Sequence, residues 1–287
     1  MGGGIGNGLF FLISGYLFSF KKDVKRDVLK RYIRLFIPAY IMIIITALFG
    51  LLHVDNAISA IRVFVWPTQF WFVGAIFAYS ALLYVLIQKD IGNRKNFLSF
   101  TVFLILVDLI LYVFCIPDKS AWIVEDAYIL FIPFRCIYCL FIFVLGYYLK
   151  VNKQLIERLN RGFVVISAVI TFILFYGFKF LLNKGIVPMG MQIFSQPLTV
   201  ICALCIFLSF AAIEMNPKWE SMMIGSSIKK LAMLSLETYL VQFLIIAGIS
   251  SLNIVFPINM FICIVMTFIS AWVLHWIDTW ILNKLMM

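Results

Sequence analysis

Charged residues are scarce in this sequence. Of its 287 residues only 13% are Asp, Glu, Lys or Arg, and 64% are hydrophobic. A soluble globular domain has about 25% charged and 45–50% apolar residues. The shortage of charge excludes a soluble domain, because too little polar surface remains to cover the apolar side chains. We therefore expect the apolar surface to face lipid.

Long polar segments are also missing. The longest connections between apolar blocks, at 53–69, 116–127 and 214–230, are all under twenty residues. No internal repeat is visible, and inverted repeats would have favoured a secondary transporter. A soluble domain has no room between the blocks, so residues 1–287 are predicted to form a single membrane domain.

Apolar blocks of about 20 residues are present instead, the length that crosses a bilayer core of about 30 Å as an α-helix. The fold prediction is an all-α polytopic membrane bundle with about nine transmembrane helices. The predicted helices are 5–20, 35–52, 70–88, 97–115, 128–149, 163–182, 193–213, 231–252 and 254–282.

Positive charge predicts the orientation of these helices. Lys and Arg gather in short cytoplasmic loops, and these helix boundaries place eighteen of the 23 Lys and Arg residues on one side and three on the other. We expect the C-terminus to be cytoplasmic. The net charge of +10 lies in separate short loops, which predicts contact with the lipid bilayer and no nucleic-acid partner.

Two Cys-x-x-Cys pairs, Cys136 with Cys139 and Cys202 with Cys205, have the spacing of a metal site. All four cysteines lie in predicted membrane helices, where forming four thiolates would be costly. We interpret them as packing residues and predict no metal site.

Several ionisable residues fall inside predicted spans, where one charge costs about 2.5–3.5 kcal/mol and needs a partner or a function. Asp108 and Arg135 lie at matching depths of an antiparallel hairpin, which predicts an ion pair or an acceptor pocket. Glu237 lies about two turns inside its predicted helix. His275 and Asp278 share a helix face at positions i and i+3, where a carboxylate can orient an imidazole, so His275 is a candidate acid–base residue, and Glu237 is a second candidate because of its depth.

Short motifs follow one another along nearly the whole chain. Residues 10–16 read F-F-x-x-S-G-Y, with Phe10, Phe11, Ser14 and Gly15, and residues 31–34 read R-x-x-R shortly before a proline. Further motifs are W-F at Trp71, the L-G-Y that follows Arg135, and Y-L-x-Q from Tyr239 to Gln242.

In this order the motifs resemble those of the acyltransferase 3 family, integral membrane enzymes with ten helices that acylate sugars. In many relatives the position of Gln242 is a histidine. The family's first helix, with a reactive histidine, would precede Met1, so the resemblance implies an N-terminally truncated member. It also implies a bacterial inner-membrane location.

The resemblance implies transfer of an acyl group, most often acetyl, from a cytoplasmic acyl-CoA to a hydroxyl of a cell-surface or exported carbohydrate. Acyl-CoA is the donor substrate, and no bound cofactor is expected. Lys30, Arg31 and Arg34 are the predicted ligands of its phosphates, because clustered guanidinium groups bind phosphate well.

Two other functions stay open. A saccharide transporter or flippase would use Asp108, Arg135 and Glu237 to line its pathway, and it would work without the basic residues of the first loop. An inactive degenerate paralogue would have neither activity.

Overall fold

The computed structural model describes residues 3–19, 24–50, 63, 70–115, 131–214, 233–252 and 254–286. These described residues form helices, turns and no strand. Six of their helices are long and apolar enough to cross a membrane, and three shorter apolar helices are Gly4–Leu17, Cys136–Val151 and Ser235–Ser251. The all-α polytopic membrane fold is thereby confirmed.

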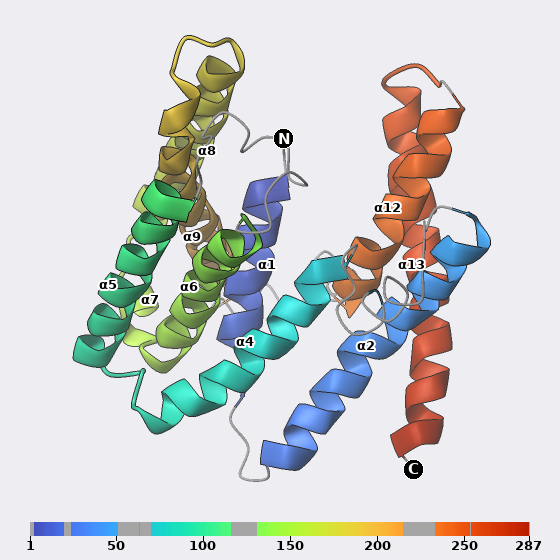
Figure 1. The fold of residues 1–287 in the computed structure, drawn as a ribbon, viewed down its shortest axis with the longest axis horizontal. Coiled ribbons are helices and arrows are strands. Elements are labelled where there is room, and N and C mark those ends of the chain that lie inside the picture. Colours follow the sequence, from blue (N-terminus) through green and yellow to red (C-terminus); the bar gives the residue numbers. More distant parts are fainter. Residues whose placement is uncertain are drawn as a thin grey trace. The chain divides into compact units, whose positions relative to one another are not determined.

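The helices fall into two compact units. In the first unit α1 packs against both α6 and α9, α8 packs on α9, and α5 packs on α6 (Figure 1). From Tyr79 onward α4 also belongs to this unit. The elements are α1 (Gly3–Leu17), α4 (Trp71–Gln88), α5 (Arg94–Ile110), the π-helix η2 (Leu111–Cys115), α6 (Phe131–Val151), α7 (Gln154–Glu157), α8 (Arg161–Asn183), the 3-10 helix η4 (Met189–Phe194) and α9 (Ser195–Glu214).

Two glycines set the crossing of α1 and α6. A Cβ atom at Gly15 of α1 would overlap the carbonyl oxygen of Phe143, and one at Gly146 of α6 would overlap the carbonyl oxygen of Leu12. Small residues at a helix crossing let the backbones approach closely, which is a common way to join helices in lipid. The glycines of the F-F-x-x-S-G and L-G-Y motifs therefore lie at one and the same contact.

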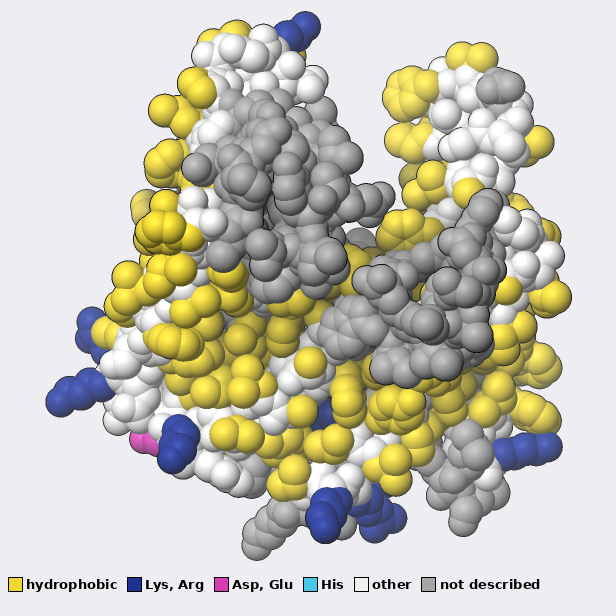
Figure 2. Space-filling model, in the orientation of Figure 1, with side chains coloured by type: hydrophobic (Ala, Val, Ile, Leu, Met, Phe, Trp, Pro, Cys, Tyr) yellow, Lys and Arg dark blue, Asp and Glu magenta, His cyan; other side chains and the backbone are white. Residues whose placement is uncertain are grey.

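Much of this unit's surface is apolar and uncovered by protein. Ile105 of α5 is 51% exposed, and Ile166 and Ile173 of α8 are 60% and 63% exposed. Figure 2 shows hydrophobic side chains along the sides of the helices. Such surface is typical of helices that face lipid.

The second unit consists of α2 (Val24–Leu48), α12 (Ser235–Ser251), α13 (Ile258–Met286) and the beginning of α4. The helices α12 and α13 form a hairpin, and α2 packs against both. Their shared core is apolar and contains Phe36, Met42, Leu240, Ala271 and Leu274.

Two predicted boundaries were wrong. The structure begins α2 at Val24, whereas the prediction began a helix at 35 and placed a basic loop before it. Lys and Arg are good helix formers, so the charged segment continues the helix. Glu237 lies in the first turn of α12, nearer the helix end than predicted.

Candidate functional site

A polar cluster lies within the second unit, where α12 begins. Glu237 comes from α12, and His275 and Asp278 come from α13. The α13 residues Ala271, Leu274 and Asp278 are buried and recur at helical spacing. Glu237 and Asp278 are each only 4% exposed. The faces of α12 and α13 that form the apolar core therefore each also bury one carboxyl group.

The Glu237 carboxylate holds the His275 imidazole. His275 Nδ1 lies 2.6 Å from Glu237 Oε1, and the His275 side chain is 32% exposed. An ionised carboxylate can only accept, so in this pair Nδ1 donates and Nε2 is left as the nitrogen that can take a proton. A carboxylate that orients an imidazole in this way is a general acid–base arrangement.

Two carboxyl oxygens of this cluster lack hydrogen bonds. Glu237 Oε2 and Asp278 Oδ1 are buried, and neither has a hydrogen-bond partner in the part of the chain that the structure describes. Leaving a buried polar atom unsatisfied costs about 1–3 kcal/mol. Native proteins have few such atoms, and each calls for an explanation, among them a catalytic role.

Arg34 connects the cluster to the basic start of α2. Arg34 is close enough to the cluster for its positive charge to act on the Asp278 carboxyl group. Arg34 and Lys30 are exposed and lie one turn apart on α2. The positive surface and the buried acid–base pair thus meet within one unit.

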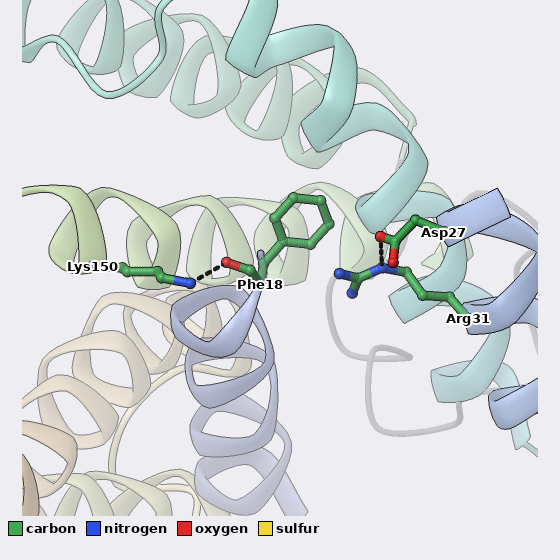
Figure 3. A network of polar contacts seen from close by, with 4 residues as sticks. All are labelled: Phe18, Asp27, Arg31 and Lys150. Atoms are coloured by element: carbon green, nitrogen blue, oxygen red, sulfur yellow. Dashed lines mark hydrogen bonds and ion pairs between the residues drawn. The ribbon is translucent and has the colours of Figure 1, made fainter. Parts of the chain in front are cut away.

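Arg31 is positioned by a neighbouring carboxylate. Its Nε donates to Oδ2 of Asp27 over 2.9 Å, across one turn of α2 (Figure 3). Asp27 is 5% exposed and the Arg31 side chain is 25% exposed. The three predicted phosphate ligands therefore differ, since only Arg31 has an ion pair with Asp27.

Aromatic rings join α4 and α12 in the same unit. Tyr239 lies 4.7 Å from Phe72 and 5.6 Å from Phe243, and Trp71 lies 6.2 Å from Phe72, between ring centroids. Gln242 is partly buried on α12. The W-F and Y-L-x-Q motifs are therefore packed together by their rings.

The F-F-x-x-S-G segment has a packing role in the first unit. Phe11 is fully buried with its ring 5.5 Å from that of Tyr79, and Phe10 and Ser14 are partly buried. Lys150 Nζ donates to the backbone oxygen of Phe18 over 2.5 Å, just beyond the end of α1 (Figure 3). This contact satisfies a carbonyl that the helix end leaves open.

The predicted site residues thus divide between the units. Glu237, His275, Lys30, Arg31 and Arg34 lie in the second unit, and Asp108 lies in the first. The side chain of Arg135 is outside the described residues, so the Asp108–Arg135 ion pair stays a prediction.

The bond between His275 and Glu237 was not predicted, because these residues are 38 positions apart and sequence spacing pairs only neighbours on one helix. The sequence signal that could have found the pair is the cost of placing an ionisable side chain in a membrane helix, which each of the two residues carries and a partner would offset.

Among the described His, Cys, Asp and Glu residues, no group of three or more could hold a metal ion.

The fold and site define a helical integral membrane protein with a basic helix start beside a buried carboxylate–imidazole pair. Residues 1–276 match the model of the acyltransferase 3 family, described as an acyltransferase domain. The chain belongs to this family, which supports activity as a membrane acyltransferase. No curated protein and no solved structure matches the chain in the corresponding comparisons.

Proposed function

We propose that the chain transfers an acyl group, most often acetyl, from a cytoplasmic acyl-CoA to a hydroxyl of a cell-surface or exported saccharide. We place it in a bacterial inner membrane with its C-terminus in the cytoplasm. One observation carries the proposal: the Glu237–His275 bond joins α12 and α13 in the same unit in which α2 exposes Lys30 and Arg34.

The donor binds at the basic start of α2. Acyl-CoA carries several phosphates, and Lys30 and Arg34 offer exposed positive charges one turn apart. Arg31, oriented by Asp27, adds a guanidinium group that binds phosphate through two parallel hydrogen bonds. Because the basic start of α2 and the Glu237–His275 pair belong to one unit, the bound donor can present its thioester to His275.

The Glu237–His275 pair transfers the proton that the acceptor hydroxyl loses and the CoA sulfur gains. The acceptor oxygen forms a bond to the acyl carbon, the carbon–sulfur bond breaks, and the CoA thiolate leaves. Nε2 of the imidazole takes the hydroxyl proton as the oxygen attacks and then gives it to the leaving sulfur, while Glu237 stabilises the ring during its charged state. The products are an ester and free CoA thiol, with no other reactant.

Donor binding tests this proposal. Calorimetric titration of the full chain in lipid nanodiscs with acetyl-CoA should give saturable binding that weakens about 10-fold or more in Arg34→Ala, because a charge-assisted hydrogen bond contributes about 1.5–3 kcal/mol. Arg94→Ala is the matched control, since Arg94 is also exposed, at the start of α5. Equal weakening in both variants would show non-specific charge attraction and contradict the proposal.

A second measurement separates binding from chemistry. His275→Gln should keep its affinity for acetyl-CoA while the rate of acyl transfer to glycan falls about 100-fold or more, the usual contribution of an acid–base group. Unchanged transfer in this variant would remove His275 from the mechanism.

A further inference from the structure

We propose a second, separate binding site in the first unit, formed by α5, α6 and the η4–α9 segment around Asp108 and Gln192, which takes a neutral ligand rich in hydroxyl groups. It rests on the proposed function only in identifying this ligand with the saccharide acceptor.

One stripe of α5 faces the protein. Phe97, Leu104 and Tyr112 are buried, and Thr101 and Asp108 each have a buried oxygen atom. These five residues recur every three or four positions, as one face of a helix does. The neighbouring residues Phe103, Ile105 and Ile110 are more than half exposed. Asp108 therefore points into the unit and away from the lipid-facing side.

The elements opposite this stripe are polar. The Tyr112 hydroxyl donates to the backbone oxygen of Gly190 in η4. From α6 the Tyr138 hydroxyl lies 3.5 Å from the backbone oxygen of Gln196, near the Thr199 side chain and Asp108. Three helical segments thus bring hydroxyl, amide and carboxylate groups together inside an otherwise apolar unit.

Two acceptor atoms of this cluster have no donor. Asp108 Oδ1 and Gln192 Oε1 are buried without a hydrogen-bond partner in the described structure, and Gln192 is only 9% exposed. Gln192 Oε1 only accepts hydrogen bonds, and a carboxyl oxygen accepts or, when protonated, donates, so the ligand that satisfies both atoms must be able to donate and to accept. Sugar hydroxyls do both and carry no charge, whereas the ionised phosphates of acyl-CoA only accept.

The backbone at this place is also unusual. The α-helix α5 ends at Ile110, and the π-helix Leu111–Cys115 follows directly and contains Tyr112. Such π-helical turns occur frequently at functional sites. The turn directs Tyr112 toward η4 one turn after Asp108, which places both residues on the same wall of the site.

Ligand-dependent stability tests the site. Thermal unfolding of the full chain in nanodiscs is measured without ligand and with the methyl glycoside of glucose, galactose, N-acetylglucosamine or rhamnose. A ligand that binds the folded state raises the midpoint temperature of unfolding. At least one glycoside should raise the midpoint of the wild type. Asp108→Leu and Gln192→Leu should lose this increase, and Asp108→Asn, which keeps the shape, should reduce it.

Two matched variants serve as controls. Thr171→Val removes a hydroxyl group of α8 that bonds the Ser167 backbone oxygen outside the site, and Asp278→Asn changes a buried carboxyl group of the second unit; both should keep the glycoside effect. No midpoint increase in the wild type, or an increase that survives Asp108→Leu and Gln192→Leu, would overturn the site. Acetyl-CoA binding to Asp108→Leu is measured in parallel and should persist, so a failure of the donor site would be seen separately.

Discussion

The two units of this membrane protein are stabilised by different means. In the first unit, Gly15 and Gly146 bring the backbones of α1 and α6 into direct contact. In the second, ring contacts such as that of Phe72 on α4 with Tyr239 on α12, 4.7 Å apart, and the Glu237–His275 bond join the helices. Close backbone packing tolerates no added atom, whereas ring and polar contacts tolerate small changes. Each unit therefore has its own kind of weak point.

Both units bury unsatisfied carboxyl oxygens, but they differ in the polar groups that accompany them. The second presents Lys30 and Arg34 on its surface, which suits an anionic donor. The first buries Asp108 and Gln192, whose unsatisfied atoms are acceptors, which suits a neutral hydroxyl ligand. If both assignments hold, donor and acceptor are recognised by separate parts of the chain, and variants of each part should affect one ligand alone.

The largest effect is expected at the glycine contact. Gly15→Ala or Gly146→Ala should destabilise the protein by about 3 kcal/mol, because the new Cβ forces the two helices apart. Gly177→Ala is the control, since no atom lies within 4 Å of a Cβ there, and replacing a glycine inside a helix should stabilise it by about 0.5–1 kcal/mol. Thermal unfolding in detergent compares them, and equal midpoints would contradict the close crossing.

A smaller loss is expected in the second unit. Glu237→Gln and His275→Gln should each cost about 1–3 kcal/mol, because each leaves the other buried partner with a weakened bond. The double variant should cost less than the sum, with a coupling of at least about 0.5 kcal/mol. Strict additivity in equilibrium unfolding would show that the two side chains do not interact. Glu157→Gln, on the exposed surface of α7, is the control.

These contacts show what sequence could and could not predict. Apolar blocks of about 20 residues predicted where helices lie, because lipid imposes that length. They did not predict that α2 begins at Val24, because charge patterning marks a membrane side and not a backbone conformation. Nor did they pair Glu237 with His275 or Gly15 with Gly146, since contacts between distant helices depend on how the helices cross.

The end of α1 offers a test of intermediate size in the first unit. Lys150→Met keeps the length of the side chain and removes the ammonium that binds the Phe18 backbone oxygen. We expect a loss of about 1 kcal/mol, the usual contribution of one hydrogen bond. Lys153→Met is the control, because Lys153 is exposed beyond the end of α6. An equal change in the unfolding midpoints of both variants would mean that the contact with Phe18 contributes nothing.

The smallest change in stability, and the sharpest separation of stability from binding, is expected at Asp27. Asp27→Asn weakens a contact between residues one turn apart on α2, and such pairs contribute only about 0.5 kcal/mol. The same change removes a negative charge beside Arg31 and should strengthen acetyl-CoA binding about 2-fold or more, because the Asp27 carboxylate no longer repels the phosphates. Calorimetric titration at low salt measures it, with Asp90→Asn, an exposed Asp of the first unit, as the control. If Asp27→Asn weakened donor binding, the Asp27 carboxylate would be needed to orient Arg31, and positioning would outweigh charge at this end of α2.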